Sequence, residues 1–336
     1  MALNPKLLAE LRRTGARVSP DALLAPLSRW KIGGRAAALV EPGTAAQAAA
    51  ALRIMADRPE PLFIMGDASN VLFDSAGFSG VVLRISRRMS AMRISATHVW
   101  AEAGIWVPHL ARRVGSAGLS GIEHTIGIPG TLGGLILMNG GSLRKGIGLN
   151  VVAVHCAGAG GERFTLDRSD CGFGYRTSAL QQMRAVVLAA ELELAPADPR
   201  TVRRDMLAIM RERRAKFPQS LANCGSTFLS TPEMHATIGP PGRAIETAGL
   251  KGIRRNGAQI SPMHGNFLIN TGGATSGDIL WLIALIRQTV EARTGFAMDC
   301  EVRHLAFDGR LRPAHLAAEE LWGAVMRRDA VQLCGT

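Results

Sequence analysis

The N-terminal part of the chain alternates between short apolar runs of strand length and longer stretches of helical composition. Residues 45–57 are rich in alanine and end before Pro59, which predicts a helix, and a second helix is expected over 106–114. We expect strands over 62–65, 81–85, 99–103, 151–156, 163–166 and 185–194. In the last of them apolar positions alternate with Glu191 and Glu193, which is typical of a half-buried strand.

The pattern changes at Pro196-Ala197-Asp198-Pro199, where two prolines flank an alanine and an acidic residue. Proline interrupts both helices and sheets, so we place a domain boundary there. Beyond this boundary we expect a charged helix over 201–214, short strands near 226–229, 258–260 and 266–269, a final strand over 301–307 and a partly helical tail over 308–336.

The most sharply defined helix lies in the C-terminal part of the chain. Thr275 or Ser276 can cap its N-terminus, and Asp278 lies in the first turn, where the helix dipole favours a negative charge. A broad apolar stripe follows, and Gly295 ends it. We therefore expect one amphipathic helix between these residues.

The composition argues against several classes of protein. The longest apolar run, Ile279 to Ile286, is much shorter than the roughly 20 residues of a membrane-spanning helix, and residues 1–18 lack the continuous apolar core of a secretory signal. The five cysteines include no Cys-x-x-Cys pair, which argues against a disulfide framework and a zinc site. We expect a cytoplasmic protein with free, buried thiols, no bound metal and no membrane partner.

The chain carries a formal net charge of +12. Its positive residues are scattered as pairs, such as Arg87-Arg88 and Arg112-Arg113, and it contains a single tyrosine. Proteins that bind single-stranded nucleic acids place aromatic side chains among the positive charges so that bases can stack. We therefore expect no nucleic-acid partner, whereas a small anionic ligand is compatible with this charge.

The two common nucleotide-binding signatures are missing from the sequence: no Gly-x-Gly-x-x-Gly opens a helix after a strand, and no Gly-x-x-x-x-Gly-Lys occurs. Two other loops rich in small residues are present, Gly66-Asp67-Ala68-Ser69-Asn70 and Gly127-Ile128-Pro129-Gly130-Thr131-Leu132-Gly133-Gly134. Small residues allow backbone N–H groups to face an anion. Taken alone, the first loop is better explained as an ordinary strand-to-loop turn, and the second fits a phosphate cradle and tight packing of two elements equally well.

Several further segments, in the same order along the chain, resemble the UDP-N-acetylenolpyruvoylglucosamine reductase family. In the first half these are the two glycine loops, Trp30-Lys31-Ile32-Gly33-Gly34, Gly118 to Glu123, Met138-Asn139 and Gly172-Phe173-Gly174-Tyr175-Arg176-Thr177-Ser178. In the second half they are Arg213 to Pro218, Gly225-Ser226-Thr227-Phe228, Ile245 to Gly252, Gly257 to Ser261, His264-Gly265-Asn266-Phe267 and Glu301-Val302-Arg303. The resemblance is colinear from about residue 28 to residue 305.

This resemblance implies an α+β protein with an FAD-binding domain of the vanillyl-alcohol-oxidase/PCMH type over 28–196 and an α+β substrate-binding domain over 200–307. Residues 1–27 would form an N-terminal helical extension, and 308–336 a C-terminal tail. In the family, NADPH reduces FAD, and flavin N5 passes hydride to the enolpyruvyl double bond of UDP-N-acetylglucosamine enolpyruvate. The product is UDP-N-acetylmuramate, a peptidoglycan precursor, so the implied protein is a monomeric flavoprotein oxidoreductase that acts on a nucleotide sugar.

The same resemblance implies the residues of the site. The FAD-binding residues would be Ile32, Gly33, Gly66, Asp67, Ala68, Ser69, Asn70, Gly127, Ile128, Pro129, Gly130, Thr131, Gly133 and Gly134, and the substrate-binding residues Tyr175, Lys216 and Asn266. Arg176 would stabilise the enolate, Ser226 would donate a proton, and Glu301 would assist formation of the enol or enolate. Hydride addition requires such groups, because it leaves negative charge beside a carboxylate and a carbon to be protonated.

The sequence also departs from the family pattern. The family usually continues Met-Asn with Ala-Gly-Ala-Tyr-Gly and an acidic residue, whereas this chain reads Gly140-Gly141-Ser142-Leu143-Arg144-Lys145-Gly146. Two cations thus replace an aromatic and an acidic residue. This change leaves two alternatives open: a paralogue that keeps FAD but reduces or oxidises another substrate, and a non-catalytic module that binds an anion.

Overall fold

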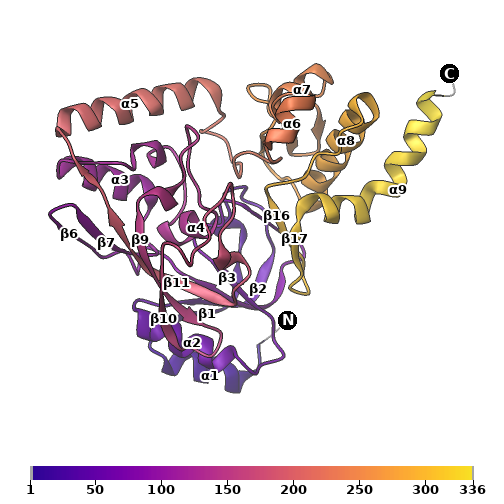
Figure 1. The fold of residues 1–336 in the computed structure, drawn as a ribbon. Helices are drawn as coiled ribbons and strands as arrows, with labels where there is room; N and C mark the ends of the chain where they lie inside the picture. The colour runs from indigo at the N-terminus through magenta and orange to yellow at the C-terminus, as the bar shows by residue number, and fades with distance from the viewer. Residues whose placement is uncertain (1–2, 335–336) are drawn as a thin grey trace. The chain divides into compact units, whose positions relative to one another are not determined.

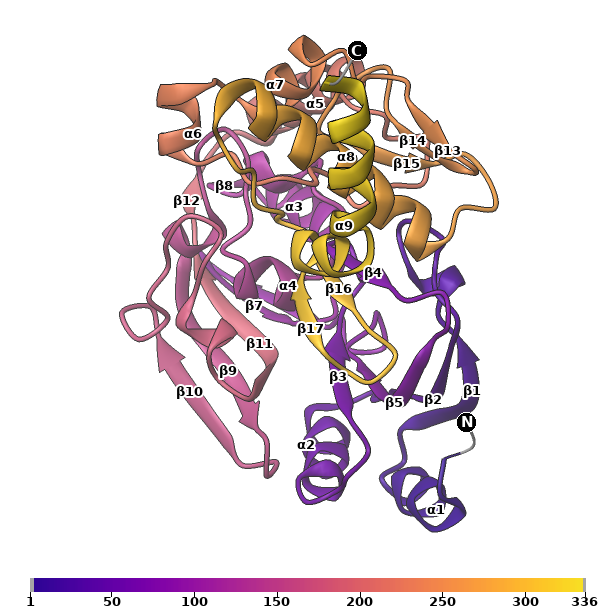
Figure 2. The same ribbon diagram turned by 90° about the vertical axis from the view of Figure 1, so that its right-hand side faces the viewer.

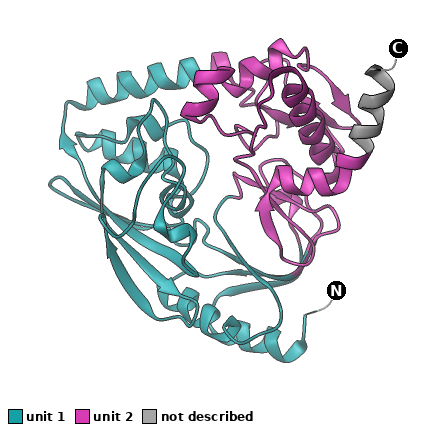
Figure 3. Cartoon of the chain, turned by 45° about the vertical axis from the view of Figure 1, so that its right-hand side comes forward, with its two compact units in different colours: residues 1–22, 36–67, 80–213 teal, residues 23–35, 68–79, 214–336 magenta. Residues whose placement is uncertain are grey.

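The computed structural model (Figures 1 and 2) describes the backbone of residues 3–334 and the side chains of residues 3–324. Contacts among the residues divide the chain into two compact units (Figure 3). Unit 1 contains Met1–Ala22, Ala36–Asp67 and Gly80–Arg213, and unit 2 contains Leu23–Arg35, Ala68–Ser79 and Arg214–Thr336. Each unit is therefore assembled from segments that are distant in the sequence.

Unit 1 contains most of a four-stranded sheet with the strand order β1-β2-β5-β3. The strands are β1 (Arg17–Leu23), β2 (Arg35–Glu41), β5 (Phe78–Arg84) and β3 (Leu62–Met65), and the helices α1 (Pro5–Arg13) and α2 (Ala45–Met55) precede and follow β1 and β2. β3 runs parallel to β5, so that Met65 lies opposite Arg84. Leu7 and Leu11 of α1 are buried in the core of this unit. The start of the predicted N-terminal extension is therefore an integral part of unit 1.

A five-stranded antiparallel sheet with the order β10-β9-β11-β7-β6 completes unit 1, and Figure 1 labels its five strands. Its strands are β10 (Arg163–Asp167), β9 (Val151–Gly158), β11 (Ala185–Glu193), β7 (His98–Glu102) and β6 (Met92–Ser95). The alternation predicted in β11 is confirmed, because Ala190 and Leu192 are fully buried whereas Glu193 is exposed. The smaller elements of this unit are α3 (Val107–Ser116), α4 (Leu132–Leu137), β8 (Leu119–Ser120), β12 (Ala195–Pro196) and the 3-10 helices Glu123–Thr125, Ile147–Leu149 and Ala179–Gln181.

The boundary between the units lies at Arg213–Arg214, beyond the 196–199 segment in which the sequence places it. The reason is the packing of α5 (Pro199–Lys216), which follows this proline segment. Val202 and Met206 of α5 are buried in the core of unit 1. A Cβ atom added at Gly115 of α3 would lie 2.7 Å from Val202 Cγ1, so the two helices approach closely at this glycine.

Unit 2 contains two small sheets. One has the order β13-β14-β15, with β13 (Arg254–Arg255), β14 (Ala258–Ile260) and β15 (Leu268–Asn270), and the other the order β17-β16-β4, with β17 (Leu311–Pro313), β16 (Arg303–Leu305) and β4 (Val71–Phe73). The strands predicted near 258–260 and 266–269 are therefore confirmed. The prediction of a strand at 226–229 is wrong, because this segment makes only an isolated bridge between Phe228 and Cys300. The prediction that 301–307 is the final strand is also wrong, because β17 follows β16.

Helices make up the rest of unit 2: the 3-10 helix Ala25–Leu27, α6 (Pro232–Thr237), α7 (Pro241–Thr247), α8 (Ser276–Thr294) and α9 (Ala314–Cys334). The predicted ends of α8 are confirmed. Thr275 Oγ1 accepts from Asp278 N (3.2 Å), and Asp278 Oδ2 accepts from Thr275 N (2.9 Å), which forms a capping box. Gly295 ends the helix with φ +72°, a conformation that favours glycine.

The predicted C-terminal tail is packed into unit 2 over its described side chains. Ala314, Ala317 and Ala318 of α9 are buried in the same core as the apolar residues of α8, and the two helices lie side by side (Figure 1). The Arg255 guanidinium lies 4.8 Å from the Trp281 ring of α8 and 4.4 Å from the Trp322 ring of α9. These cation–π contacts link the two helices through β13.

The cysteine side chains that the structure describes agree with the expectation of free, buried thiols. The side chains of Cys156, Cys171, Cys224 and Cys300 are free and buried, and that of Cys334 lies outside the described side chains. Burial raises the pKa of Cys156 and that of Cys224 to about 12. Among the described helices, none has both the length and the hydropathy to cross a membrane. Within the described residues, no cluster of His, Cys, Asp and Glu has the makeup of a metal site.

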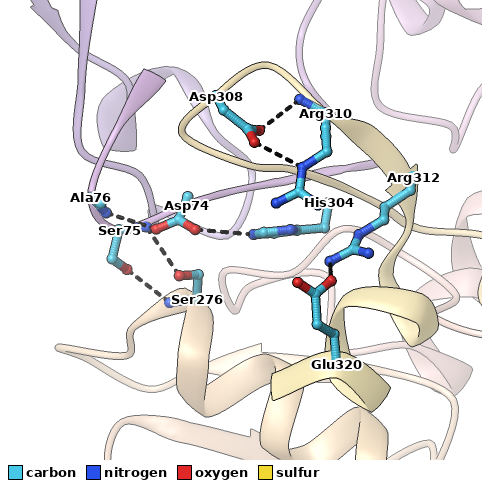
Figure 4. Close-up of polar contacts among 9 residues, drawn as sticks. All are labelled: Asp74, Ser75, Ala76, Ser276, His304, Asp308, Arg310, Arg312 and Glu320. Atoms are coloured by element: carbon cyan, nitrogen blue, oxygen red, sulfur yellow. Dashed lines mark hydrogen bonds and ion pairs between the residues drawn. The ribbon is translucent and has the colours of Figure 1, made fainter. Parts of the chain in front are cut away.

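A partly buried contact between an aspartate and a histidine lies where β4 meets β16 in unit 2 (Figure 4). Asp74 follows β4, and its Oδ2 lies 3.5 Å from Nε2 of His304, whose side chain is only 5% exposed. The adjacent Ser75 exchanges two hydrogen bonds with Ser276 at the start of α8 (3.0 and 2.8 Å). The 68–79 segment is therefore attached both to the C-terminal strand pair and to the longest fully described helix of this unit.

We expect Asp74→Asn to lower the melting temperature near pH 7, because the amide removes the charge that faces His304. The hydrogen bond with the His304 side chain holds the pKa of Asp74 below its usual value of 3.8. This stabilisation is therefore present above pH 3.8 and is lost as the pH falls below that value. Melting curves from pH 7 to pH 3 should show a difference between wild type and variant that shrinks in acid, and a constant difference would contradict this assignment.

We expect Gly34→Ala to destabilise the protein by about 1–3 kcal/mol, because the added carbon would clash with backbone atoms. It would lie 2.5 Å from both Gly77 N and Ser75 O. Gly277→Ala is the matched control, since the nearest neighbour there is Thr275 Oγ1 at 3.7 Å and alanine favours the helix. Urea unfolding of both variants measures the difference, and equal stabilities would show that the 30–34 segment can move aside.

Candidate functional site

The two glycine loops meet in unit 1. A Cβ atom added at Gly66 would lie only 2.1 Å from Thr131 Oγ1, so the first loop approaches the second as closely as a glycine allows. The boundary between the units falls between Asp67 and Ala68, inside the first loop. Gly66 and Asp67 therefore belong with the second loop, whereas Ala68, Ser69 and Asn70 belong to unit 2.

An arginine on β5 holds the start of the first loop. Arg84 Nε donates to Gly66 O (3.4 Å), and Arg84 Nη2 lies 3.5 Å from Asp67 Oδ1. Its Nη1 contacts Glu41 at 3.2 Å, so one cation faces two carboxylates. Sequence reasoning missed Arg84. The signal available in the sequence was the acidic residue at position 67, because a partly buried carboxylate needs a cation nearby.

Packing accounts for several glycines of the second loop. Gly133 N donates to Ala103 O (2.8 Å), and a Cβ atom at Gly133 would lie 3.0 Å from that of Ala103. Gly130 has φ +152° and its carbonyl accepts from Val107 N (2.9 Å). The tight-packing explanation therefore applies to 130–133, whereas residues 127–129 are half-exposed.

Arg176 lies in a two-residue turn of unit 1. Gly174 and Thr177 exchange backbone hydrogen bonds of 3.0 and 3.3 Å on either side of it. Its backbone has φ +53°, a left-handed conformation that costs a non-glycine residue about 1 kcal/mol. Gln181 Nε2 donates to Arg176 O (3.0 Å), and Arg176 Nη1 contacts Gly141 O at 3.5 Å. Surrounding contacts thus hold an arginine in an unfavourable conformation, which is typical of functional sites.

Arg213 of α5 is a second arginine at this place. A Cβ atom added at Gly127 would lie 2.4 Å from both Cδ and Nε of Arg213, so the side chain packs against the second loop. Burial lowers the pKa of the Arg213 guanidinium, and the charge of Arg176 lowers it further. In the sequence, Arg213 falls in a segment that resembles the family, but we predicted no role for it. Its contact with Gly127 joins residues far apart in the sequence, and no local pattern reveals such a contact.

His124 connects the second loop with the altered 140–146 segment. Its side chain is 3% exposed, and within the described residues its Nε2 has no hydrogen-bond partner. Burial, followed by the charge of Lys145, lowers the pKa of His124. Ser142 Oγ donates to His124 O (2.5 Å), which fixes the altered segment to the loop region.

In unit 2, the structure brings Ser226 and Glu301 onto neighbouring segments. Glu301 N donates to Thr227 O (2.9 Å), and Leu229 N donates to Asp299 O (2.9 Å). Between these bonds lies the bridge of Phe228 and Cys300. Segments 226–229 and 299–301 are therefore paired through their backbones, and Ser226 and Glu301 lie on these two paired segments.

The end of the first glycine loop is attached to the same place. Asn70 Nδ2 donates to Glu301 O (3.0 Å), and Arg303 N donates to Asn70 O (3.1 Å). Asn70 lies next to β4, which runs parallel to β16. The side chain of Asn70 is thus used to hold the backbone of Glu301.

The other expected residues of unit 2 have different surroundings. Ile32 is 1% exposed and lies in the core, and a Cβ atom at Gly33 would lie 2.9 Å from Phe73 Cβ. Asn266 is 4% exposed. Lys216 precedes Phe217, whose ring stacks on Phe267 and contacts His264 with centroid distances of 4.9 and 5.2 Å. Burial, followed by the charge of Lys251, lowers the pKa of His264.

The expected residues are therefore divided between the units. Arg176, Tyr175 and the second loop belong to unit 1, and Ser226, Glu301, Lys216 and Asn266 to unit 2. Tyr175 is 57% exposed, and its ring lies 5.7 Å from the Arg176 guanidinium.

Comparison with protein families gives two matches. The model of an FAD binding domain matches residues 36–167, and the model of the C-terminal domain of UDP-N-acetylenolpyruvoylglucosamine reductase matches residues 217–305. The first match contains both glycine loops, and the second contains Ser226, Asn266 and Glu301.

Individual proteins are similar over nearly the whole chain. UDP-N-acetylenolpyruvoylglucosamine reductase 1 of Corynebacterium glutamicum is 46% identical over 91% of this chain and 91% of its own length. The reductase of Synechococcus sp. strain WH7803 is 38% identical over 85% of this chain and 92% of its own. The crystal structure of the reductase from Thermus caldophilus has a TM-score of 0.73 and 28% identity, and the match covers 86% of this chain and 99% of that one. The chain therefore has the expected α+β fold and belongs to the UDP-N-acetylenolpyruvoylglucosamine reductase family.

Proposed function

We propose that this protein uses NADPH and bound FAD to reduce UDP-N-acetylglucosamine enolpyruvate to UDP-N-acetylmuramate. The observation that carries the proposal is the pairing of the Ser226 and Glu301 segments, to which Asn70 of the first glycine loop is also attached. The residues that we propose as proton donor and acid thereby lie on paired segments, next to the end of a loop that we expect to contact the cofactor. Membership of the reductase family supports the same reaction. We propose further that the enzyme is a monomer and acts in the cytoplasm.

The residues of unit 1 fit an FAD group. Gly66 and Thr131 bring the two loops together, and both loops lie within the segment that matches an FAD binding domain. Nε2 of His124 is a buried polar atom without a hydrogen-bond partner among the described residues, and such atoms are typical of ligand sites. When bound, FAD supplies the hydride that it has received from NADPH. We propose that Gly66, Asp67 and the second glycine loop, all of unit 1, contribute to holding it.

Arg176 and Arg213 would stabilise the negative charge of the reaction. Hydride addition to the enolpyruvyl group leaves charge on the neighbouring carbon and its carboxylate, and preoriented cations stabilise charge that develops in a transition state. Arg176 is preoriented by its turn and by its contact with Gly141 O. Arg213 lies half-buried beside it, against the second loop. We assign enolate stabilisation to Arg176 and binding of a substrate or cofactor anion to Arg213.

Ser226 and Glu301 would complete the reaction in unit 2. We assign proton donation to the Ser226 hydroxyl, and we assign to the Glu301 carboxyl the support of the enol or enolate before the proton arrives. The bond from Glu301 N to Thr227 O fixes the separation of the two backbones. Lys216 and Tyr175 remain our proposed contacts with the nucleotide sugar.

We expect Ser226→Ala to separate the two half-reactions. NADPH should still reduce the flavin at the wild-type rate, because the serine takes no part in that step. Reoxidation of the reduced flavin by the enolpyruvyl nucleotide should slow by about 10²–10⁴-fold, the usual contribution of a general acid. Anaerobic stopped-flow absorbance of the flavin measures both steps, and an equal loss in both would contradict the proton-donor role.

We expect Arg84→Ala to weaken FAD binding by about tenfold or more, because Gly66 loses a hydrogen bond and two carboxylates lose their shared cation. Asp67→Gly in the Arg84→Ala background should restore part of the affinity by removing one of those carboxylates. Fluorescence titration of apoprotein with FAD measures the effect in both variants. Unchanged affinity in Arg84→Ala would mean that the loop keeps its conformation without this cation.

A further inference from the structure

Asn266 acts as a strand partner for Phe228, although the two residues lie in no common strand. Phe228 N donates to Asn266 Oδ1 (2.8 Å), and Asn266 Nδ2 donates to Phe228 O (3.0 Å). Residues that face each other in an antiparallel sheet exchange the same two hydrogen bonds through their backbones. Here the side-chain amide of Asn266 takes the place of one of the two backbones and makes both hydrogen bonds.

The backbone of Asn266 contributes a third bond to the same segment. Thr227 N donates to Asn266 O (2.9 Å). Asn266 N in turn donates to His264 Nδ1 (3.2 Å), which orients the turn before β15. A single residue thus supplies partners for the N–H of Thr227 and for both backbone polar groups of Phe228.

The opposite edge of this segment is held by residues 299–301. Thr227 O accepts from Glu301 N (2.9 Å), and Leu229 N donates to Asp299 O (2.9 Å). Segment 227–229 therefore lies between Asn266 on one edge and the Glu301 segment on the other. The neighbouring Gly225 has φ +80° and no atom within 4 Å of an added Cβ, and its N–H donates to Asn223 Oδ1 (2.9 Å).

Burial leaves the side chain of Asn266 little access to a ligand. Its amide already accepts one hydrogen bond and donates one, and the residue is only 4% exposed. A substrate contact needs an accessible polar group, and binding sites place such groups at the cavity wall. The geometry thus favours an indirect role for a residue that the sequence resemblance places in the substrate site.

We propose that Asn266 is a positioning residue, which keeps Ser226 in register with Glu301 for protonation of the substrate and does not itself bind the substrate. This inference rests on the function proposed above. Loss of the amide would let 226–228 shift on one edge while the other edge stays paired. Such a shift moves the proton donor relative to the acid, and a displacement of about 1 Å can slow a reaction by about 100-fold.

The test uses the FAD-loaded enzyme, reduced anaerobically with NADPH and mixed with UDP-N-acetylglucosamine enolpyruvate. For Asn266→Ala, we expect reoxidation at saturating substrate to slow by about 10- to 100-fold. The half-saturating substrate concentration should stay within about threefold of wild type, and flavin reduction by NADPH should be unchanged. Melting temperature and FAD content verify that the variant is folded.

A second variant gives a signature that depends on pH. The Asn266→Asp carboxylate can accept from Phe228 N but cannot donate to Phe228 O, whereas the protonated carboxyl can do both. Its reoxidation rate, relative to wild type at the same pH, should therefore rise as the pH falls. Asn256→Gly is the control, since it removes a side-chain hydrogen bond of the same unit (Asn256 Nδ2 to Asp278 Oδ1, 2.7 Å) away from Ser226. This control should reoxidise at the wild-type rate.

Two results would overturn the proposal. A tenfold or greater rise in the half-saturating concentration with an unchanged maximal rate would make Asn266 a substrate ligand. A rate for Asn266→Asp that does not recover in acid would show that donation to Phe228 O is irrelevant. A wild-type flavin that NADPH reduces but the nucleotide does not reoxidise is a different outcome, since it refutes the proposed function itself and this inference with it.

Discussion

The hydrogen bond from Glu301 N to Thr227 O is the contact on which the candidate site of unit 2 depends. It joins two segments too short to form a regular sheet, and it sets how far the Ser226 backbone lies from that of Glu301. Asn266 supports one side of this pairing, and Asn70 supports the other through Glu301 O. Buried backbone N–H and C=O groups need hydrogen-bond partners. Here the side-chain amides of Asn266 and Asn70 provide partners that a neighbouring strand would provide in a regular sheet.

In unit 1, the main constraint is the close approach of the two glycine loops. Gly66 and Gly127 have no side chain, and Thr131 and Arg213 occupy the space that a Cβ atom would need. A larger residue at either position would therefore push the two loops or Arg213 apart. Arg84 then fixes the first loop by neutralising Asp67 and Glu41 together.

The sequence predicts those features of the fold whose causes are local. The ends of α8 follow from Thr275, Asp278 and Gly295, and the exposure of β11 follows from its alternation. The segment 226–229 is misjudged as a strand because its partners include a side chain and a single bridge, which no periodicity reveals. The boundary at 196–199 is displaced because α5 buries Val202 and Met206 in the preceding unit. Arg84 and Arg213 escape notice because their roles arise only when distant segments meet.

Unit 2 recruits Leu23–Arg35 and Ala68–Ser79 from the early part of the chain. Asn70 and Glu301, which are joined by a hydrogen bond, are separated by 231 positions. During synthesis on the ribosome, β4 therefore stays unpaired with β16 until most of the remaining chain has been made. Contacts between residues so distant in the sequence slow folding, and strand edges stay exposed until these contacts form. Neither unit corresponds to one uninterrupted stretch of the sequence. A single recombination event between the genes of two relatives could therefore not exchange one whole unit for another.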